Sequence, residues 1–379
     1  MARLLHRAAL IACTAILLAL GAASGTSAQD EEDTYWQGRR DAVWAHGINK
    51  FGDSNWYSKR PPQDGGPFQG TALDVPCKTK NPPVPCNGVA IFAQGAREYD
   101  IRIGDDAQGR RPEIREMLFP HNDEKYTFDV RTFFTIKGGG IRNNDITPPL
   151  FTIAAARNGS TIAGIIVDDA LLQSRGDWPD ARFRIRQGGQ LIFQGNSRGG
   201  DAEVKNFGGE VRFEGFASAA RMRITNRSQP SPFISRLSLT GNSTGGDGHF
   251  INQQRGQLNF GSTAGPGGNG SISAGKIENT GGALDLSTNT IRVGDSFTQE
   301  AEGTLSIHHD GSKHGRLIVG KDATLGGTLL ATGFFRPSLV GPHTILRTEG
   351  RRIGRFDNET LNGGRLEYGP KTVVLVIGD

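Results

Sequence analysis

A repeat of twenty residues between Arg186 and Asn226 limits this chain to a small set of folds. Glycine, aliphatic, aromatic and asparagine positions all recur at this distance: Gly188/Gly208, Gly189/Gly209, Leu191/Val211, Phe193/Phe213, Gly195/Gly215, Ala202/Met222, Val204/Ile224 and Asn206/Asn226. A fixed period of this size is typical of a solenoid, in which each repeat forms one coil and contacts only its neighbours.

Each repeat has the pattern of short strands that are followed by turns. Apolar residues stand two apart, as Leu191 and Phe193 do, which is the spacing of a strand with one buried face. Glycine, asparagine or serine follows within a few residues, where the chain must turn. No window here has apolar residues at helical spacing over three turns. The pattern therefore predicts an all-β fold of stacked coils, with parallel neighbours about 4.8 Å apart.

The two-apart apolar pairs extend over most of the chain. From the repeat onward they stand at 191/193, 211/213, 237/239, 258/260, 284/286, 305/307 and 329/331. Between Tyr99 and Ile185 the pairs are equally plain, but their period is loose. We therefore expect a parallel β-helix, or β-solenoid, over residues 121–340, with these pairs lining its interior.

The first 28 residues are predicted to be a secretory signal peptide. Arg3 and Arg7 precede the apolar run 8–23, and residues 26–28 offer a cleavage site of small side chains. The run is shorter than the roughly 20 residues that a membrane-spanning helix needs. We expect the mature chain to be exported to the cell surface or the extracellular space, with the periplasm as the alternative.

Residues 29–120 are predicted to form an N-terminal capping region. Trp36, Trp44 and Trp56 lie here, and such aromatic residues can cover the open edge of the first coil. Stacking of the indole rings on sugars is the functional alternative. Cys77 and Cys86 flank a proline-rich segment, and a disulfide between them is expected after export, because two thiols are too few for a metal site.

Composition excludes two further classes. The chain has 43 Lys and Arg against 39 Asp and Glu, with both signs mixed throughout, so we expect no nucleic-acid partner. Its 54 glycines follow no Gly-X-Y period, which excludes collagen. They suit the turns of a β structure with many turns.

Several segments together resemble the passenger domains of bacterial autotransporters. The block GGQLIFQGNSRGGDAEVKNFGGEVRFEG (188–215) looks like passenger repeats. The early W-x-G, N-W and A-I-F series looks like the start of such passengers. Their end is similar to GRLIVGKDATLGGTLLATG (315–333), HTILRTEG (343–350), GRFD (354–357) and LEYGPKTVVLVI (366–377). The resemblance covers residues 34–379 and implies a pertactin-like, right-handed parallel β-helix from a Gram-negative cell, often serving adhesion.

Members of this family normally continue into an outer-membrane β-barrel, for which this sequence has no room. We therefore expect a passenger that is released alone, is partnered by a separately encoded outer-membrane barrel, or comes from a degenerate gene. Residues 341–379 contain β-branched runs at 344–348 and 372–377 and a turn at 369–370. They are predicted to form hairpins that cap the last coil.

Parallel β-helices also carry polysaccharide lyases and hydrolases, so catalytic residues have to be considered. Asp168, Asp169, Asp247 and His249 invite comparison with pectin-lyase-like galacturonases, which use several carboxylates on one face and a nearby histidine. Adjacent residues of a strand face opposite ways, so Asp168 and Asp169 do not both point at a substrate unless the chain bends. We expect solvated positions here and no enzyme; a polysaccharide lyase or hydrolase is the alternative.

A histidine-rich segment raises the question of metal binding. It contains His308, His309, Asp310 and His314. Neighbouring side chains of a strand diverge, and the segment is polar and glycine-containing. We therefore expect a surface loop, with no metal and no cofactor.

Arg175-Gly176-Asp177 is a tripeptide that animal integrins read in exposed loops, although abundant glycine makes a chance match the plain alternative. The tripeptide is a weak candidate for a binding site, and the fold and the resemblance lead to the prediction of a non-enzymatic adhesin or interaction scaffold. The elongated side of the coil would contact a host-cell surface, matrix or polysaccharide.

Overall fold

The computed structural model of the chain describes residues 33–36, 56–57, 72–73, 89–92, 100–104, 113–120, 125–155, 162–174, 179–229, 233–310, 312–333 and 340–378. The chain divides into two units, Met1–Glu32 and Asp33–Asp379, and every described residue belongs to the second. These residues contain no helix, and thus none that could cross a membrane.

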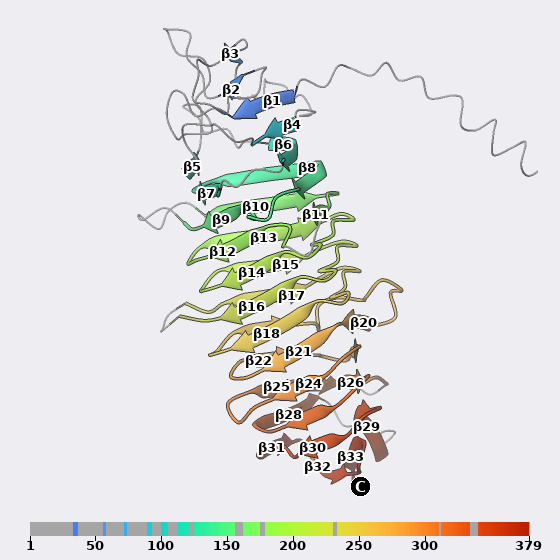
Figure 1. Cartoon of the computed structure of the whole chain (residues 1–379). Coiled ribbons are helices and arrows are strands. Elements are labelled where there is room, and N and C mark those ends of the chain that lie inside the picture. Colours follow the sequence, from blue (N-terminus) through green and yellow to red (C-terminus); the bar gives the residue numbers. More distant parts are fainter. Residues whose placement is uncertain are drawn as a thin grey trace, which may run out of the picture. The chain divides into compact units, whose positions relative to one another are not determined.

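The described strands form three sheets (Figure 1). The first sheet contains β1 (Asp33–Trp36), β2 (Trp56–Tyr57), β3 (Ala72–Leu73), β4 (Val89–Ile91), β6 (Glu113–Phe119), β8 (Phe133–Asn143), β10 (Ala163–Asp168), β11 (Leu172–Ser174), β13 (Gly189–Gln194), β15 (Glu210–Phe213), β17 (Arg236–Leu239), β19 (Gln257–Asn259), β22 (Ala283–Asp285), β25 (Thr304–His309), β28 (Thr328–Gly333) and β31 (Asn358–Leu361). The second contains β5 (Asp100–Ile103), β7 (Thr127–Val130), β9 (Leu150–Ile153), β12 (Arg182–Ile185), β14 (Glu203–Asn206), β16 (Arg223–Arg227), β18 (His249–Gln253), β21 (Lys276–Asn279), β24 (Phe297–Gln299), β27 (Ala323–Leu325) and β30 (Arg352–Gly354). The third contains β20 (Ser271–Ala274), β23 (Thr290–Val293), β26 (Arg316–Val319), β29 (Gly341–Thr348), β32 (Gly364–Tyr368) and β33 (Thr372–Ile377).

Strands that pair in parallel within these sheets come from successive coils. The second sheet is parallel along its whole described length, and the first is parallel from β4 to β31. In the third sheet, β20, β23, β26 and β29 are parallel. The fold is therefore all-β with large parallel sheets, as the repeat predicts, and it is consistent with a parallel β-helix.

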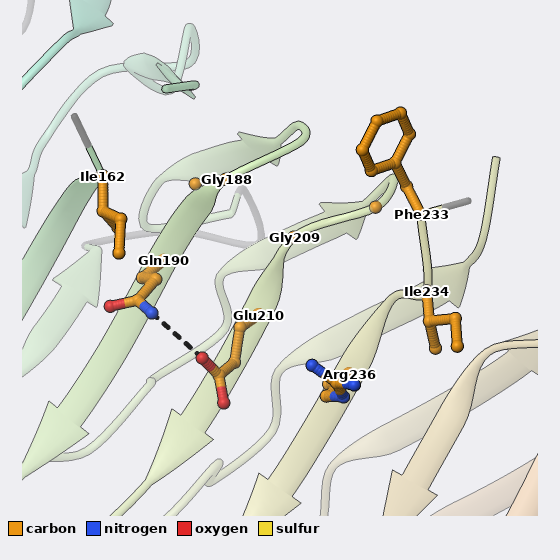
Figure 2. A pocket seen from close by; sticks show the side chains of 10 residues that line it. Ile162, Gly188, Gln190, Gly209, Glu210, Phe233, Ile234 and Arg236 are labelled. Carbon is orange, nitrogen blue, oxygen red and sulfur yellow. Dashed lines mark hydrogen bonds between the residues drawn. The ribbon is translucent and has the colours of Figure 1, made fainter. Parts of the chain in front are cut away.

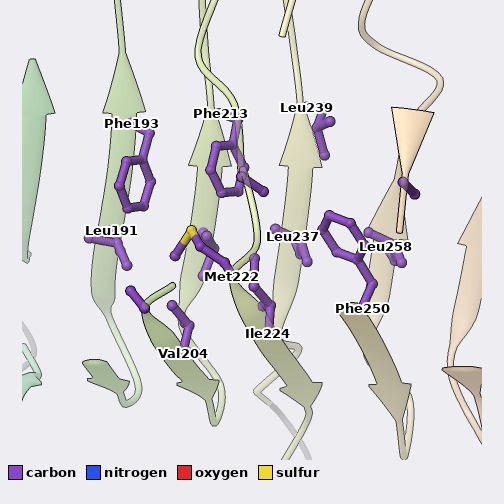
Figure 3. Close-up of a cluster of buried hydrophobic side chains, with 14 of the residues drawn as sticks. Leu191, Phe193, Val204, Phe213, Met222, Ile224, Leu237, Leu239, Phe250 and Leu258 are labelled. Carbon is purple, nitrogen blue, oxygen red and sulfur yellow. The ribbon is translucent and has the colours of Figure 1, made fainter. Parts of the chain in front are cut away.

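The apolar pairs lie in the register that their spacing predicts. Leu191 pairs with Val211 and Val211 with Leu237, and the column continues through Leu258, Leu284, Leu305 and Leu329. All fourteen residues of the seven pairs are buried. Figure 3 shows part of this set, from Leu191 and Phe193 to Leu258, together with Val204, Ile224 and Phe250 of the second sheet. The interior is thus one hydrophobic core that runs from coil to coil.

Aromatic rings stack along this core. The rings of Phe193 and Phe213 lie 4.9 Å apart and are nearly parallel, at 8°. Phe151 stacks on Phe128 at 4.6 Å and approaches Phe183 at 5.3 Å. Stacks of this kind follow from the parallel register, because identical residues one repeat apart are placed directly above each other.

A column of buried amides lies beside the apolar core. Asn206, Asn226, Asn252, Asn279 and Gln299 occupy the same position on successive strands of the second sheet. Each amide nitrogen donates to the side-chain oxygen of the next, at 2.9, 3.0, 3.0 and 3.2 Å. The sequence pattern predicts turns at such residues, whereas these five side chains point inward and are buried. Burial is tolerated because each amide is hydrogen-bonded to its neighbours.

A second column sits at a turn and consists of glycines. Gly195, Gly215 and Gly241 have φ of 64°, 65° and 65°, in the left-handed region that side chains disfavour. A Cβ atom on Gly215 would lie 3.3 Å from the backbone of Gly195. The recurrence of glycine at this position therefore follows from backbone conformation and close stacking.

The C-terminal strands change direction. β33 pairs antiparallel with β29 and with β32, which turns into β33 at residues 369–371. The β-branched runs at 344–348 and 372–377 lie within β29 and β33, so the sequence placed both strands correctly. Leu375 and Ile377 are buried against the main core.

Candidate functional site

A shallow groove lies on the first sheet where β13, β15 and β17 begin (Figure 2). Its volume is about 300 Å³, and its lining is Ile162, Gly188, Gly189, Gln190, Gly208, Gly209, Glu210, Phe233, Ile234 and Arg236. The glycine pairs at 188–189 and 208–209 contribute backbone alone to this lining. The groove thus lies where two successive repeats carry their glycine pairs.

Three polar side chains cross the groove in a row. Gln190, Glu210 and Arg236 occupy equivalent positions on β13, β15 and β17, so they follow one another at the strand spacing of about 4.8 Å. Gln190 Nε2 donates to Glu210 Oε2 at 3.0 Å, and Arg236 Nε donates to Gln257 Oε1 at 3.4 Å. The row offers an amide, a carboxylate and a guanidinium to hydroxyl or charged groups of a ligand.

Apolar side chains flank this row. Ile162 is 53 % exposed and Ile234 is 41 % exposed, in contrast to the buried isoleucines of the core. In Figure 2, Ile162 stands near Gln190 at one end of the polar row, and Ile234, with Phe233 next to it, stands near Arg236 at the other end. A groove with a polar row and apolar side chains at its ends is suited to an extended polymer that has both polar groups and apolar faces.

His249 belongs to a charged ladder on the second sheet. Arg223 Nη1 donates to His249 Nδ1 at 2.8 Å, which places the imidazole proton on Nε2, and Nε2 donates to Glu278 Oε1 at 3.0 Å. Lys276 Nζ lies 2.5 Å from the same carboxylate oxygen. Burial lowers the pKa of His249, and Arg223 and Lys276 add to this against the opposing effect of Glu278. Both ring nitrogens are thus engaged within the ladder.

The carboxylates considered for catalysis do not lie together. Asp168 ends β10 in the first sheet, and Asp247 is exposed in the turn before β18 of the second sheet, three coils further on. Three strand spacings amount to about 14 Å, which exceeds the separation of carboxyl pairs in glycosidases. Asp169 has a φ of 48° and accepts hydrogen bonds from Asn196 N at 2.8 Å and Asn196 Nδ2 at 3.1 Å. Its carboxylate therefore stabilises the turn that contains Asn196.

Several predicted features lie outside the described residues. They are the signal peptide, Cys77 and Cys86, the tripeptide Arg175-Gly176-Asp177, and Trp44. The backbone of Trp36 and Trp56 is described in β1 and β2, which pair antiparallel. These predictions stay predictions.

Three histidines come together near the C-terminal end of the first sheet. His309 and His314 come from the histidine-rich segment, and the third is His343 of β29, which no sequence pattern connects with them. Their potential ligand atoms all lie within 4.8 Å of one another. Burial, with the nearby imidazoles of His343 and His314, lowers the pKa of His309; burial likewise lowers the pKa of His314. No local motif links residues 314 and 343, because the solenoid topology alone brings them together.

Comparison with known proteins does not assign the chain to a family. No protein-family model matches the sequence. A search of curated proteins finds no significant match either.

Proposed function

We propose that this protein is an exported, non-enzymatic interaction protein whose coil binds an extended polymer along its side. In this proposal the fold is a right-handed parallel β-helix of the autotransporter-passenger type. Residues 29–120 and 341–379 cover its two ends, and a separately encoded outer-membrane barrel is one route to the cell surface. The stacked parallel sheets and the quoted passenger-like segments support it.

The groove is the observation that carries the proposal. Its lining combines Gln190, Glu210 and Arg236 with the exposed side chains of Ile162 and Ile234. Sugars of a polysaccharide present hydroxyl groups at their edges and apolar C–H faces, and both have counterparts here. Because the polar column continues from Arg236 to Gln257 on β19, a polymer longer than the groove can also contact Gln257. We therefore favour a surface or matrix polysaccharide as the ligand.

The residues that line the groove favour binding over catalysis at this site. Glycoside hydrolysis uses a pair of carboxyl groups that flank the bond to be cleaved. The lining supplies a single carboxylate, that of Glu210, and Gln190 already donates a hydrogen bond to it. A binding role is thus better supported than a hydrolase or lyase, which stays the alternative.

The test is a binding assay on a panel of neutral and acidic polysaccharides, with release of reducing or unsaturated ends followed in parallel. We expect saturable binding of at least one polymer, loss of that binding in Arg236→Gln and Ile234→Ser, and no new chain ends. Thr304→Ala, on the same outer column several coils away, serves as the control and should bind as the wild type does. New chain ends would favour the enzyme, and binding that survives both groove substitutions would exclude this groove as the site.

A further inference from the structure

His309 and His314, which lie in one short segment, are brought together with His343 from a distant strand. His309 is the last residue of β25, His314 forms an isolated antiparallel bridge with His309, and His343 lies in β29 of the third sheet. The ring of His343 lies 5.0 Å from that of His309 and 5.3 Å from that of His314, nearly perpendicular to the first, at 88°, and 71° from the second. The rings of His309 and His314 lie 5.6 Å apart at 23°. All three imidazoles thus converge on one point.

Hydrogen bonds orient this cluster. His314 Nε2 lies 3.1 Å from the carbonyl oxygen of Thr344, so Nε2 carries the proton and Nδ1 keeps its lone pair. Histidines that bind metals commonly donate their second ring nitrogen to a carbonyl or carboxylate in this way. His309 is 4 % exposed, which holds its ring in place. Two of the three rings are therefore positioned before any ion arrives.

The neighbouring acidic residue does not belong to the cluster. The Asp310 Oδ1 atom accepts hydrogen bonds from the backbone nitrogens of Ser312 at 3.0 Å and Lys313 at 2.8 Å. These bonds lower the pKa of Asp310 and fix the turn that leads from His309 to His314. Asp310 thus shapes the loop, and the cluster offers nitrogen ligands alone.

We propose that His309, His314 and His343 bind one divalent transition-metal ion of the zinc class. Imidazole suits Zn²⁺ and its first-row neighbours, whereas Mg²⁺ and Ca²⁺ prefer oxygen ligands. Three histidines supply three ligands of a tetrahedral site, and a water molecule supplies the fourth. Zn–N distances of 2.0–2.1 Å place ligand nitrogens about 3.4 Å apart. The present separations of up to 4.8 Å close to that value by modest rotation of the side chains.

Such an ion joins parts of the chain that the repeat does not connect. β25 belongs to the first sheet, whereas β29 links the parallel part of the third sheet to the antiparallel strand β33. An ion bound to the folded state alone stabilises it by mass action. The site therefore fastens the C-terminal strands to the coil that precedes them, independently of what the groove binds.

The experiment uses the full chain without a polyhistidine tag, first dialysed against EDTA. Zn²⁺ binding is measured by titration calorimetry, and Co²⁺ is added separately, because its absorption spectrum reports tetrahedral coordination. We expect one equivalent of Zn²⁺, a tetrahedral Co²⁺ spectrum and a higher Tm with Zn²⁺ present. Loss of a residue outside the ligand shell already costs 10–100-fold in affinity, so His343→Gln should weaken binding by about 100-fold or more.

A neighbouring histidine provides the control. His308 precedes His309 in the same strand, faces the other way and lies 3.3 Å from Thr332 Oγ1 through its Nδ1. His308→Gln should bind Zn²⁺ as tightly as the wild type. His314→Gln is a second ligand variant, and the metal-free circular dichroism spectrum of each variant verifies that it folds. Absence of stoichiometric binding, or a wild-type affinity in both His343→Gln and His314→Gln, would overturn the proposal.

Discussion

The side chain of Asn206 donates a hydrogen bond of 2.9 Å to the side chain of Asn226, which stands at the same position one coil later. Both residues are buried, and the column continues to Gln299. Each interior amide both accepts from the coil before it and donates to the coil after it. The column therefore fixes the register between coils, which apolar contacts alone specify less strictly, because a buried amide out of register would lose its partners.

Replacing a buried amide in the interior of this column should destabilise the fold more than removing one methyl group from the hydrophobic core does. Asn226 Nδ2 donates to Asn252 Oδ1 and to the carbonyl oxygen of Gln257, both at 3.0 Å. In Asn226→Ala these acceptors and the amide of Asn206 lose partners in a buried place. We expect the free energy of unfolding in urea to fall by about 2–4 kcal/mol. Thr225→Ala, one residue away on the outer face, should change it by less than about 0.5 kcal/mol; equal effects would show that the column contributes little.

The aromatic stack gives a second prediction with a matched control. Phe213 is fully buried against Phe193, whereas Phe216 is 58 % exposed three residues later. Phe213→Ala should destabilise the fold by about 3–5 kcal/mol, through lost transfer free energy and the cavity that remains. Phe216→Ala should stay within about 0.5 kcal/mol of the wild type. A similar loss for both variants in urea unfolding would contradict the buried stack.

The glycine column predicts a backbone effect. Gly215 has a φ of 65°, and an added Cβ would press on Gly195, so Gly215→Ala should destabilise the fold by about 1–2 kcal/mol. Gly294 has no left-handed φ, and the nearest atom to an added Cβ is 3.9 Å away. Gly294→Ala should therefore leave the Tm unchanged or raise it slightly. The prediction fails if the two alanine variants have the same Tm.

The sequence predicted the fold from local evidence but could not predict the clusters. The pairs from 191/193 to 329/331 depend on a two-residue alternation and a near-constant period, and both can be read along the chain. The inward position of Asn206 was missed, because polarity usually marks the outer face and only the register reveals a partner for it. His343 was missed as a neighbour of His309, since that contact depends on how β29 crosses to the third sheet. The groove was missed because its hollow arises where glycine pairs of two coils lie side by side.

The charged ladder of the second sheet predicts a loss of stability in mild acid. The pKa of His249 lies below the ordinary value of 6.5, chiefly because the ring is partly buried. Above pH 6.5 the ring is neutral in both the folded and unfolded states and contributes no pH dependence. Below pH 6.5 the unfolded chain takes up the proton first, so the free energy of unfolding falls until the folded pKa is reached. The pKa of Glu278 is also lowered, because Lys276 and His249 outweigh the opposing effect of burial, but its contribution changes only below about 4.5.

The measurement is the Tm at pH 7.5 and at pH 5.5, compared between the wild type and His249→Gln. We expect a smaller drop in Tm for the variant, because glutamine does not titrate. Arg223→Gln keeps the imidazole but removes a cation that lowers its pKa, so its drop should be intermediate. Comparison with the wild type cancels the titration of the other histidines, which are the same in all three proteins. If His249→Gln lost as much Tm between the two pH values as the wild type, the ladder would have no part in the acid sensitivity of the fold.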